Sequence, residues 1–401
     1  MAATSLAAAS TLTSCQAISA QPTKGSDAKI QPLGDLPAWI GNVRSTVPGW
    51  IDQVKHPSGP GRYRFAVDAY EPYDIDSSVM CENVIYTINY DLPSSEQKKQ
   101  WSDYLLSLQR PEDGCLIDTG MEKHIITDHD QPTPQELAKV RFWTTRNGLG
   151  TAVRLGGKPR YPVRHEFAFT TPAEMIGFLE KLPWNNPWHA GSWAGGAVVF
   201  QHFNRLLGDQ RAQTNIEAAV RWLKDKQDPN TGAWHDGSNV PLHELVNGIF
   251  KIWIQVCRIS DLPVQYPERV IDLCIRARQE SPALAKNPDM CSIFDWALVL
   301  DIALRYSAHR KAEVANMAYP CLNLIQPMVR PDGGFSYHPD RSLENHGGLA
   351  LAPSKNQSDA PGTAMACQTL ALLSNLCGLR ETLGWAPITE WQMGISAPQQ
   401  S

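Results

Sequence analysis

The chain has 401 residues, enough for one large domain or two ordinary ones, and its 42% hydrophobic and 19% charged residues are typical of a globular protein with a sizeable core. Its net charge of −5 offers no basic excess to displace phosphate counterions, which argues against a nucleic-acid surface. No apolar run reaches the roughly 18 residues that a membrane span needs.

The N-terminal segment reads as a targeting signal. Residues 1–14 are small and uncharged, so they supply the apolar and small-residue parts of a secretory signal without its basic start. Residues 12–15 (LTSC) also match a bacterial lipobox, in which Cys15 would carry the lipid. We therefore expect residues 1–35 to be a signal-like segment and linker, with a basic segment encoded upstream of Met1. A disordered Ala/Ser/Thr tail is the alternative.

The rest of the chain alternates between two kinds of predicted helix. Amphipathic segments carry apolar residues at i, i+3 and i+4 with charges elsewhere, whereas nearly uncharged segments must be buried on most sides. After a first helix at 37–54, the uncharged segments are 77–90, 135–155, 189–207, 242–259, 290–307 and 362–378, and the amphipathic ones are 95–110, 171–182, 209–227, 266–280 and 308–329.

This alternation predicts two concentric layers of helices around a central cavity. We expect an all-α fold of the (α/α)6 toroid type, a double-layered helical barrel with long rim loops, over residues 36–390. Either the helix at 37–54 or the chain after residue 380 would close the ring, and 391–401 would be a disordered tail. Strand signals are few, and 163–169 is the segment expected to form a small hairpin strand.

Three similar turns rich in Asp, Pro and Gly follow amphipathic helices, at 108–118, 225–237 and 326–340. The PDGGF sequence at Pro331–Phe335 and its two looser relatives resemble the glutamine-tryptophan turn repeats of the squalene-hopene cyclase and protein prenyltransferase β-subunit superfamily. Many polysaccharide lyases and glycoside hydrolases are similar in being (α/α) toroids. The resemblance implies the architecture of most of residues 70–380, and it speaks for the fold far more than for a reaction.

The N-terminal ends of the inner helices would open on one end of such a ring, where free N–H groups and positive dipole ends converge. We expect the active site at this mouth. Each candidate has a structural alternative, because an Asp can cap a helix, a His can bond a backbone carbonyl and a buried Glu can belong to an ion pair. The candidate catalytic residues are Asp76, Glu82, His189, His243, Glu244 and Asp359.

Aromatic residues near the mouth would form stacking platforms for a flat ligand face. Segment 330–361 is too long for a simple link, so we expect it to fold over the mouth as a lid. The candidate substrate-binding residues are Trp143, Arg146, Trp188, Trp193, Trp234, Trp296, Tyr337, His338 and His346.

Established metal and acid motifs have no good counterpart. DIDSS (74–78) departs from the DxDD-type motif of class II terpene cyclases because Ser77 replaces the third acid. Asp295 and Cys291 with a distant His match the prenyltransferase zinc set only loosely, and HExxH is absent. We therefore expect no metal and no cofactor. The cysteines after Cys15 lie in apolar stretches typical of free thiols, with one or two disulfides as the alternative.

The predicted export signal argues against an isoprenoid diphosphate as substrate, because these compounds are made and used mainly on the cytosolic side. We expect a carbohydrate-active enzyme outside the cytoplasm, periplasmic or anchored to the membrane through Cys15, with a glycoside hydrolase slightly ahead of a polysaccharide lyase. A hydrolase would place two of the candidate carboxyl groups about 6.5–9.5 Å apart for inversion. A lyase would combine a His or Tyr base with an Arg on a uronate, drawn from His189, His243, Tyr161, Arg146 and Arg164.

Two other classes stay open at this point. A terpene cyclase-like or prenyltransferase-like enzyme would wall its cavity with aromatic faces that stabilise carbocations. A non-catalytic glycan-binding lipoprotein would show no convergent pair of carboxylates. The sequence favours no particular oligomeric state.

Overall fold

The computed structural model describes residues 33–118, 122–164, 169–285 and 289–393. The lipobox with Cys15, nearly all of the predicted signal-like segment and most of the predicted tail lie outside the described residues. No helix in the described ranges has the length and apolar character that crossing a membrane requires.

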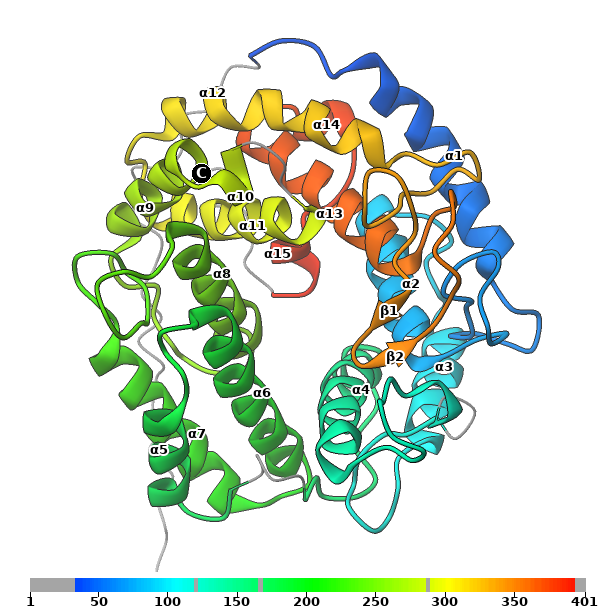
Figure 1. The fold of residues 1–401 in the computed structure, drawn as a ribbon, viewed down its shortest axis with the longest axis vertical. Helices are drawn as coiled ribbons and strands as arrows, with labels where there is room; N and C mark the ends of the chain where they lie inside the picture. Colours follow the sequence, from blue (N-terminus) through cyan, green and yellow to red (C-terminus); the bar gives the residue numbers. More distant parts are fainter. Residues whose placement is uncertain (1–32, 119–121, 165–168, 286–288, 394–401) are drawn as a thin grey trace, which may run out of the picture.

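In the part of the chain that the structure describes, six inner helices form a closed ring (Figure 1). Each one packs against the next along the chain, and the last returns to the first, which confirms the predicted alternation. The inner helices are α2 (Ile75–Ile88), α4 (Pro134–Arg154), α6 (Pro187–Leu206), α8 (Leu242–Ile252), α11 (Met290–Tyr306) and α13 (Ala360–Leu376).

An outer layer covers this ring. In it α3 packs on α4, α7 on α6, α9 against both α8 and α11, and α12 on α13, while α5 lies on α7 and α1 on α2. The prediction left two ways to close the ring, and α1 completes the outer layer. The outer helices are α1 (Ala38–Val54), α3 (Ser95–Ser107), α5 (Pro172–Lys181), α7 (Gln210–Lys226), α9 (Pro267–Glu280) and α12 (Lys311–Cys321).

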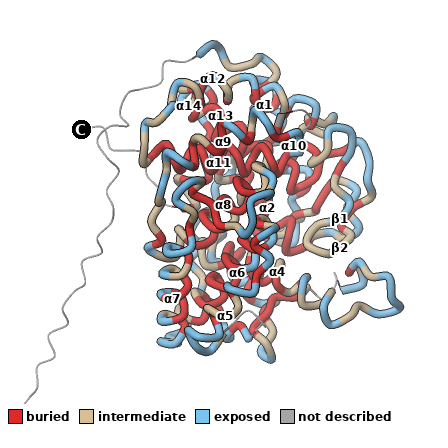
Figure 2. Tube along the Cα trace, turned by 60° about the vertical axis from the view of Figure 1, so that its left-hand side comes forward, coloured by how far each residue is buried: buried red, intermediate tan, exposed pale blue. Residues whose placement is uncertain are grey.

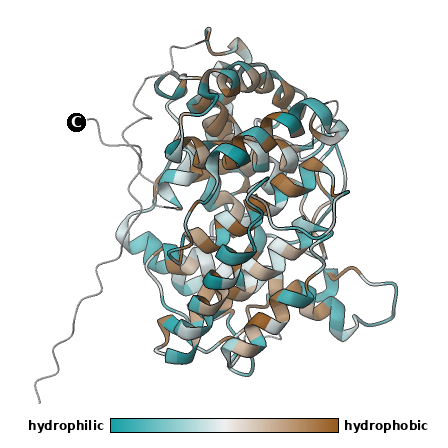
Figure 3. Ribbon diagram, turned by 90° about the vertical axis from the view of Figure 1, so that its left-hand side faces the viewer, coloured by the Kyte–Doolittle hydropathy of each residue, from teal (hydrophilic) through white to brown (hydrophobic). Residues whose placement is uncertain are grey.

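The extent of burial differs between the two kinds of helix, as the sequence predicted. Every residue of α11 from Met290 to Arg305 is buried, whereas α7 buries one face only. Figure 2 shows the buried residues gathered along the inner helices, and Figure 3 shows hydrophilic residues on the outward sides of the outer ones. The described residues therefore have an all-α fold, apart from one two-stranded hairpin.

Two of the three repeated turns share one hydrogen bond. Gln109 Nε2 donates to the carbonyl of Gly114 at 2.8 Å, and Gln227 Nε2 donates to the carbonyl of Gly232 at 2.7 Å. Both glycines have positive φ, at 67° and 72°, which a side chain rarely adopts. The third turn has Val329 in place of the glutamine and so lacks this side-chain bond, although the backbone of all three turns closes, in the third from Arg330 to Gly334. The internal repeat is therefore structural in two copies and looser in the third.

Several segments differ from the sequence prediction. The helix expected over 308–329 leaves α geometry at Cys321 and continues as the 3-10 helix η3 (Leu322–Met328), and prolines within both parts remove N–H donors. Part of the predicted strand at 163–169 lies outside the described residues, and its described ends are not strand. The hairpin is instead β1 (Asn345–His346) with β2 (Leu349–Ala350).

Short elements complete the fold. Beyond α8 the inner helix continues as the π-helical segment η2 (Trp253–Cys257). The remaining short helices are η1 (Glu122–His124), α10 (Pro282–Ala285), α14 (Arg380–Leu383) and α15 (Ile388–Trp391). All eight cysteines among the described residues are free thiols.

Candidate active site

Segment 330–361 lies over the N-terminal ends of α2 and α4, in the place predicted for a lid. The backbone N–H groups of Ile126 and Tyr70 donate to the carbonyls of Gly348 and Leu351, both at 3.0 Å. Within the hairpin, Gly347 approaches the ring of Trp143 so closely that a Cβ there would lie 2.2 Å from it. The lid is thus fitted to the first two inner helices.

Asp359 ties the lid to α13 and is a structural residue, which corrects its prediction as catalytic. It is 0% exposed, and its Oδ1 caps α13 by accepting the N–H of Gly362 at 2.7 Å. Its Oδ2 accepts the N–H groups of Tyr337 at 2.9 Å and Leu343 at 2.8 Å. Burial raises its pKa to about 6. With both oxygens bonded to backbone and no exposure, this carboxylate does not reach a substrate.

Asp76, His346 and Trp143 form a compact cluster under the hairpin. Asp76 is 3% exposed, and its Oδ2 lies 2.5 Å from Nδ1 of His346. Its Oδ1 accepts the indole N–H of Trp143 at 3.1 Å, and the His346 ring meets the Trp143 ring edge-on at 4.7 Å. A carboxylate on Nδ1 fixes the ring orientation and leaves Nε2 for proton transfer. Two predicted sites, one at each end of the sequence, therefore meet here.

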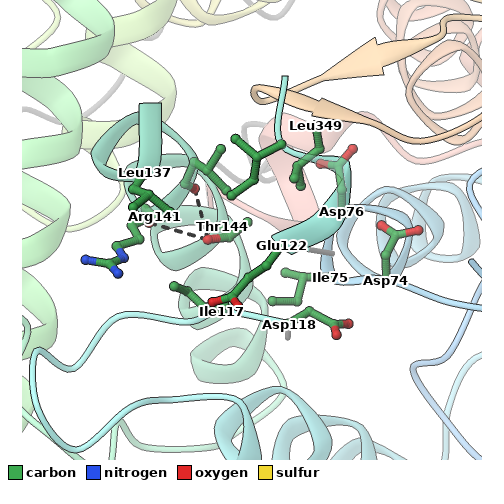
Figure 4. A pocket seen from close by; sticks show the side chains of 12 residues that line it. Asp74, Ile75, Asp76, Ile117, Asp118, Glu122, Leu137, Arg141, Thr144 and Leu349 are labelled. Carbon is green, nitrogen blue, oxygen red and sulfur yellow. Dashed lines mark hydrogen bonds between the residues drawn. The ribbon is translucent and has the colours of Figure 1, made fainter. Parts of the chain in front are cut away.

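A small, largely apolar pocket lies beside this cluster, between α2 and α4 (Figure 4). Asp74 and Asp76 line its α2 side, and Leu349 of the hairpin covers it. Asp74 caps α2 by accepting the N–H of Ser77 at 2.7 Å. Burial and the neighbouring charge of Asp76 raise the Asp74 pKa to about 7, so this acid is partly protonated near neutrality.

The ring encloses a central cavity with about 870 Å³ of empty space, part of it open to solvent. Among the described residues, no Asp or Glu lines it, although every inner helix contributes to its wall. The side chains that do line it include four cations, several amides and a set of apolar groups. The lining cations are Arg146, Arg154, Lys251 and Arg258.

Arg146 is a buried cation without a carboxylate partner among the described residues. It is 9% exposed, and its hydrogen bonds to described residues all leave from Nη1, to Ser192 Oγ at 3.1 Å, to the Ser192 carbonyl at 3.5 Å and to Gln255 Oε1 at 3.3 Å. The guanidinium also lies 4.9 Å from the Trp143 ring centre. Burial lowers its pKa to about 10, so it remains protonated at neutral pH. Its Nε and Nη2 make no hydrogen bond with the described residues.

Glu82 belongs to a buried ion pair, which corrects its prediction as catalytic. Its carboxylate is 1% exposed and is bonded by Nη2 of Arg154, by Nε of Arg154 at 3.2 Å and by Thr151 Oγ1 at 2.8 Å. Both oxygens are therefore occupied. The structural alternative given for Glu82 is the one that the structure supports.

His189 lies at the N-terminal end of α6 within a stack of three rings. Its imidazole lies nearly parallel to Trp188 at 5.5 Å and to Trp193 at 6.3 Å, and Trp193 is 39% exposed. Its backbone N–H is capped by Asn186 at 3.2 Å. This stack offers a flat, wet surface of the kind that binds sugar faces.

His243 and Glu244 lie at the start of the neighbouring helix α8. Nδ1 of His243 lies 2.8 Å from Ser281 Oγ, and its Nε2 is 3.8 Å from Glu244 Oε1. The other oxygen of Glu244 is buried without a partner. Helices α6 and α8 pack closely at this end, where a Cβ on Gly248 would lie 2.6 Å from Pro187.

Two predicted aromatic platforms are core residues instead. Trp234 is 3% exposed and donates to the Leu223 carbonyl at 2.7 Å, and Trp296 is 1% exposed and donates to the Cys274 carbonyl at 2.9 Å. Both acceptors belong to outer helices, so the indoles point away from the cavity.

Tyr337 and His338 pack against each other at 5.1 Å near the start of α11, outside the set that lines the central cavity. Burial and the nearby Cys291 raise the Tyr337 pKa far above its usual range. The sequence analysis also missed Lys251, Arg154 and Arg258. A single lysine inside the nearly uncharged segment 242–259 was the signal that could have found the first of these.

Comparisons with known proteins found similarity among solved structures only. No family model and no curated protein matches the sequence. Among solved structures, the chain is similar to Candida albicans protein geranylgeranyltransferase-I complexed with GGPP, at 11% identity over 90% of this chain and 96% of that chain, with a TM-score of 0.43. It is also similar to a polysaccharide lyase, at 14% identity over 86% of this chain and 98% of that chain, with a TM-score of 0.41.

Proposed function

We propose that the protein is a carbohydrate-active enzyme of the lyase type, which cleaves an acidic polysaccharide by β-elimination. The observation that carries the proposal is a juxtaposition around Trp143. This indole donates to Asp76 and meets the His346 ring edge-on, and its ring centre lies 4.9 Å from the guanidinium of Arg146, which has no carboxylate partner among the described residues. A base and a cation therefore both contact one aromatic residue.

The proposed chemistry uses these groups directly. Arg146 would bind the uronate carboxylate and stabilise the negative charge that develops when the neighbouring C5 proton is removed. Nε2 of His346 would take that proton, while Asp76 on Nδ1 stabilises the imidazolium. The C5–H electron pair forms the C4–C5 double bond, the C4–O bond breaks, and the leaving oxygen takes up a proton from solvent.

The lyase takes precedence over the hydrolase because a glycosidase needs two carboxyl groups facing the scissile bond. Of the four predicted acids, Glu82 and Asp359 are fully bonded within the protein, and Asp76 is engaged by Trp143 and His346. Glu244 alone keeps an oxygen without a partner. The stack at His189 supports a sugar ligand, because its exposed rings match sugar faces better than a prenyl chain buried from water.

A second candidate rests on the apolar part of the cavity wall. Phe250, Phe294 and Met365 line the same space as Arg146 and Lys251, an arrangement that would also fit an isoprenoid diphosphate. Calorimetry with farnesyl diphosphate and with an acidic oligosaccharide distinguishes the two candidate functions. The lyase hypothesis predicts that the protein binds the oligosaccharide and not farnesyl diphosphate.

The decisive assay incubates the protein with acidic and neutral polysaccharides and follows the ultraviolet absorbance of the unsaturated product. We expect absorbance with acidic substrates, and a loss of at least about a hundredfold in His346→Gln. His309→Gln is the matched control, because His309 makes a similar 2.8 Å contact with Asp272 in the outer layer. Reducing ends without absorbance would instead support the hydrolase.

Export and lipid anchoring are part of the same proposal. An extracytoplasmic enzyme attached through Cys15 would meet polysaccharides directly, and the lipobox at 12–15 supports that location. Metabolic labelling with a fatty-acid analogue tests it in cells that express the full open reading frame. Label lost in Cys15→Ser supports the anchor, whereas an unlabelled wild-type protein contradicts it.

A further inference from the structure

The end of the cavity opposite the lid is occupied by the C-terminal part of the chain. Helix α15 packs against α2, α11 and α13, and Ile388 and Gln392 contribute to the cavity wall (Figure 1). This segment meets the inner helices near their C-terminal ends, through Thr389 on α11 and Trp391 on α2, whereas His346 lies at the N-terminal end of α2. The cavity therefore has a floor made by a segment that returns into the ring.

Buried polar and aromatic contacts hold this floor in place. Thr389 is 0% exposed, donates to Asp301 Oδ2 at 2.6 Å and accepts from Arg305 at 2.9 Å. Trp391 stacks on Tyr86 of α2, with ring centres 5.3 Å apart. A buried hydroxyl in a charged network and a stacked indole hold the segment in the ring, so the floor is a part of the fold.

The floor also carries positive charge. With its amide oxygen turned inward, Gln392 accepts hydrogen bonds from Nη1 of Arg154 at 3.1 Å and from Nη1 of Arg258 at 3.3 Å. Arg154 is neutralised by Glu82, but no described carboxylate pairs with Arg258. Arg258 directly follows the π-helical segment η2, a feature that is frequent at functional sites. The cavity therefore contains two guanidinium groups that no described carboxylate neutralises. Arg146 lies near the lid, and Arg258 lies at the floor.

We infer that the ring is a blind pocket whose floor, Arg258 with Arg154 and Gln392, binds an anionic group at the terminus of the substrate. A polymer cannot pass through a ring that its own C-terminal segment closes. The substrate must then insert a chain end, so the enzyme releases short unsaturated products from that end. This inference rests on the proposed function and specifies where that activity cuts.

The first test follows product sizes over time on the acidic polysaccharide that gives absorbance. Insertion of a chain end predicts unsaturated mono- or disaccharides from the first time point, with little early fall in viscosity. Early oligomers of many lengths with a rapid fall in viscosity would overturn the inference and leave the lyase proposal standing. Absence of unsaturated product from every substrate would overturn the lyase proposal, and the floor is then tested by binding alone.

The second test addresses the floor directly through Arg258→Gln and Arg258→Lys, with Arg276→Gln as the control on the exposed face of α9. Calorimetry with a short acidic oligosaccharide and its carboxyl-reduced counterpart measures the anion site. Loss of a charged hydrogen-bonding partner predicts about 10- to 100-fold weaker binding of the acidic ligand to Arg258→Gln, partial recovery in the Lys variant and no change in the control. For turnover, KM should rise while kcat changes little. Equal affinity in all variants that retain the wild-type melting temperature would overturn the floor site.

Discussion

Two arginines on helix α4, Arg146 buried and Arg154 partly buried, differ in their charge partners, and we interpret that difference as one between a structural and a functional residue. Arg154 meets Glu82 and Thr151 in a closed network, whereas Arg146, two turns earlier, has no carboxylate partner in the described part of the chain. A buried charge is costly unless it is paired, so the protein stabilises the first arginine internally, whereas the proposed function gives the second arginine an anionic ligand.

The largest expected effect is on stability. Glu82→Gln leaves Arg154 buried without its charge partner, which should cost about 3 kcal/mol or more of unfolding free energy. Denaturant unfolding measures it. If Glu82→Gln kept the wild-type unfolding midpoint but lost turnover, Glu82 would be a catalytic residue and the structural assignment would be wrong.

Arg146→Gln should have the opposite profile. Removing an unpaired buried cation relieves a desolvation cost, so the melting temperature should stay the same or rise. Turnover of an acidic polysaccharide should fall about a hundredfold, because the charge that stabilises the enolate-like transition state is gone. Steady-state assays and thermal melts of the same preparation check both parts. Arg276→Gln serves as the surface control.

A smaller effect is expected where the lid is tied down. Asp359→Ala removes the cap of α13 and two lid hydrogen bonds, which should cost about 1–2 kcal/mol. Limited proteolysis should then cut within 337–358. Asp209→Ala removes a comparable cap from the outer helix α7, and should lose stability without exposing the lid. Equal proteolysis of the lid in both variants would contradict the anchoring role.

The last prediction is a pH dependence of stability. Burial raises the pKa of Asp295 from 3.8 to about 8, with Lys251 opposing the shift, and it raises the pKa values of Asp74 to about 7 and Asp359 to about 6. An acid with a raised folded-state pKa binds more protons folded than unfolded, so stability should fall as pH rises from about 4 to about 8. Melting temperatures across this range test it. Asp295→Asn should flatten the upper part of the curve, and an unchanged slope would remove Asp295 as its cause.

The sequence predicted the ring well because its evidence is local. A helix that is apolar on all sides must be inside, and six such segments lie within a few residues of the observed α2, α4, α6, α8, α11 and α13. The helix α1 and the chain after residue 380 were harder to place, since both carry apolar residues without showing which layer they join. An amphipathic pattern shows which face of a helix is buried, but it does not show which other helix packs against that face.

The site was only partly predictable because its decisive facts are contacts between distant residues. Nothing local in Glu82 tells that Arg154 lies beside it, and the distribution of tryptophans along the chain does not show that Trp234 and Trp296 face the outer layer. The pairing of Asp76 with His346 joins residues 270 positions apart. The sequence predicted that both residues lie at the mouth of the ring. The hairpin that brings them together packs closely against Trp143.

The contrast between the two arginines is tested most directly by one comparison. Ultraviolet absorbance of unsaturated product from an acidic polysaccharide is measured for the wild type and Arg146→Gln, beside their unfolding midpoints. We predict product from the wild type, about a hundredfold less from the variant, and no loss of stability in it. Wild-type turnover by Arg146→Gln, or a loss of stability as large as that of Glu82→Gln, would contradict the account.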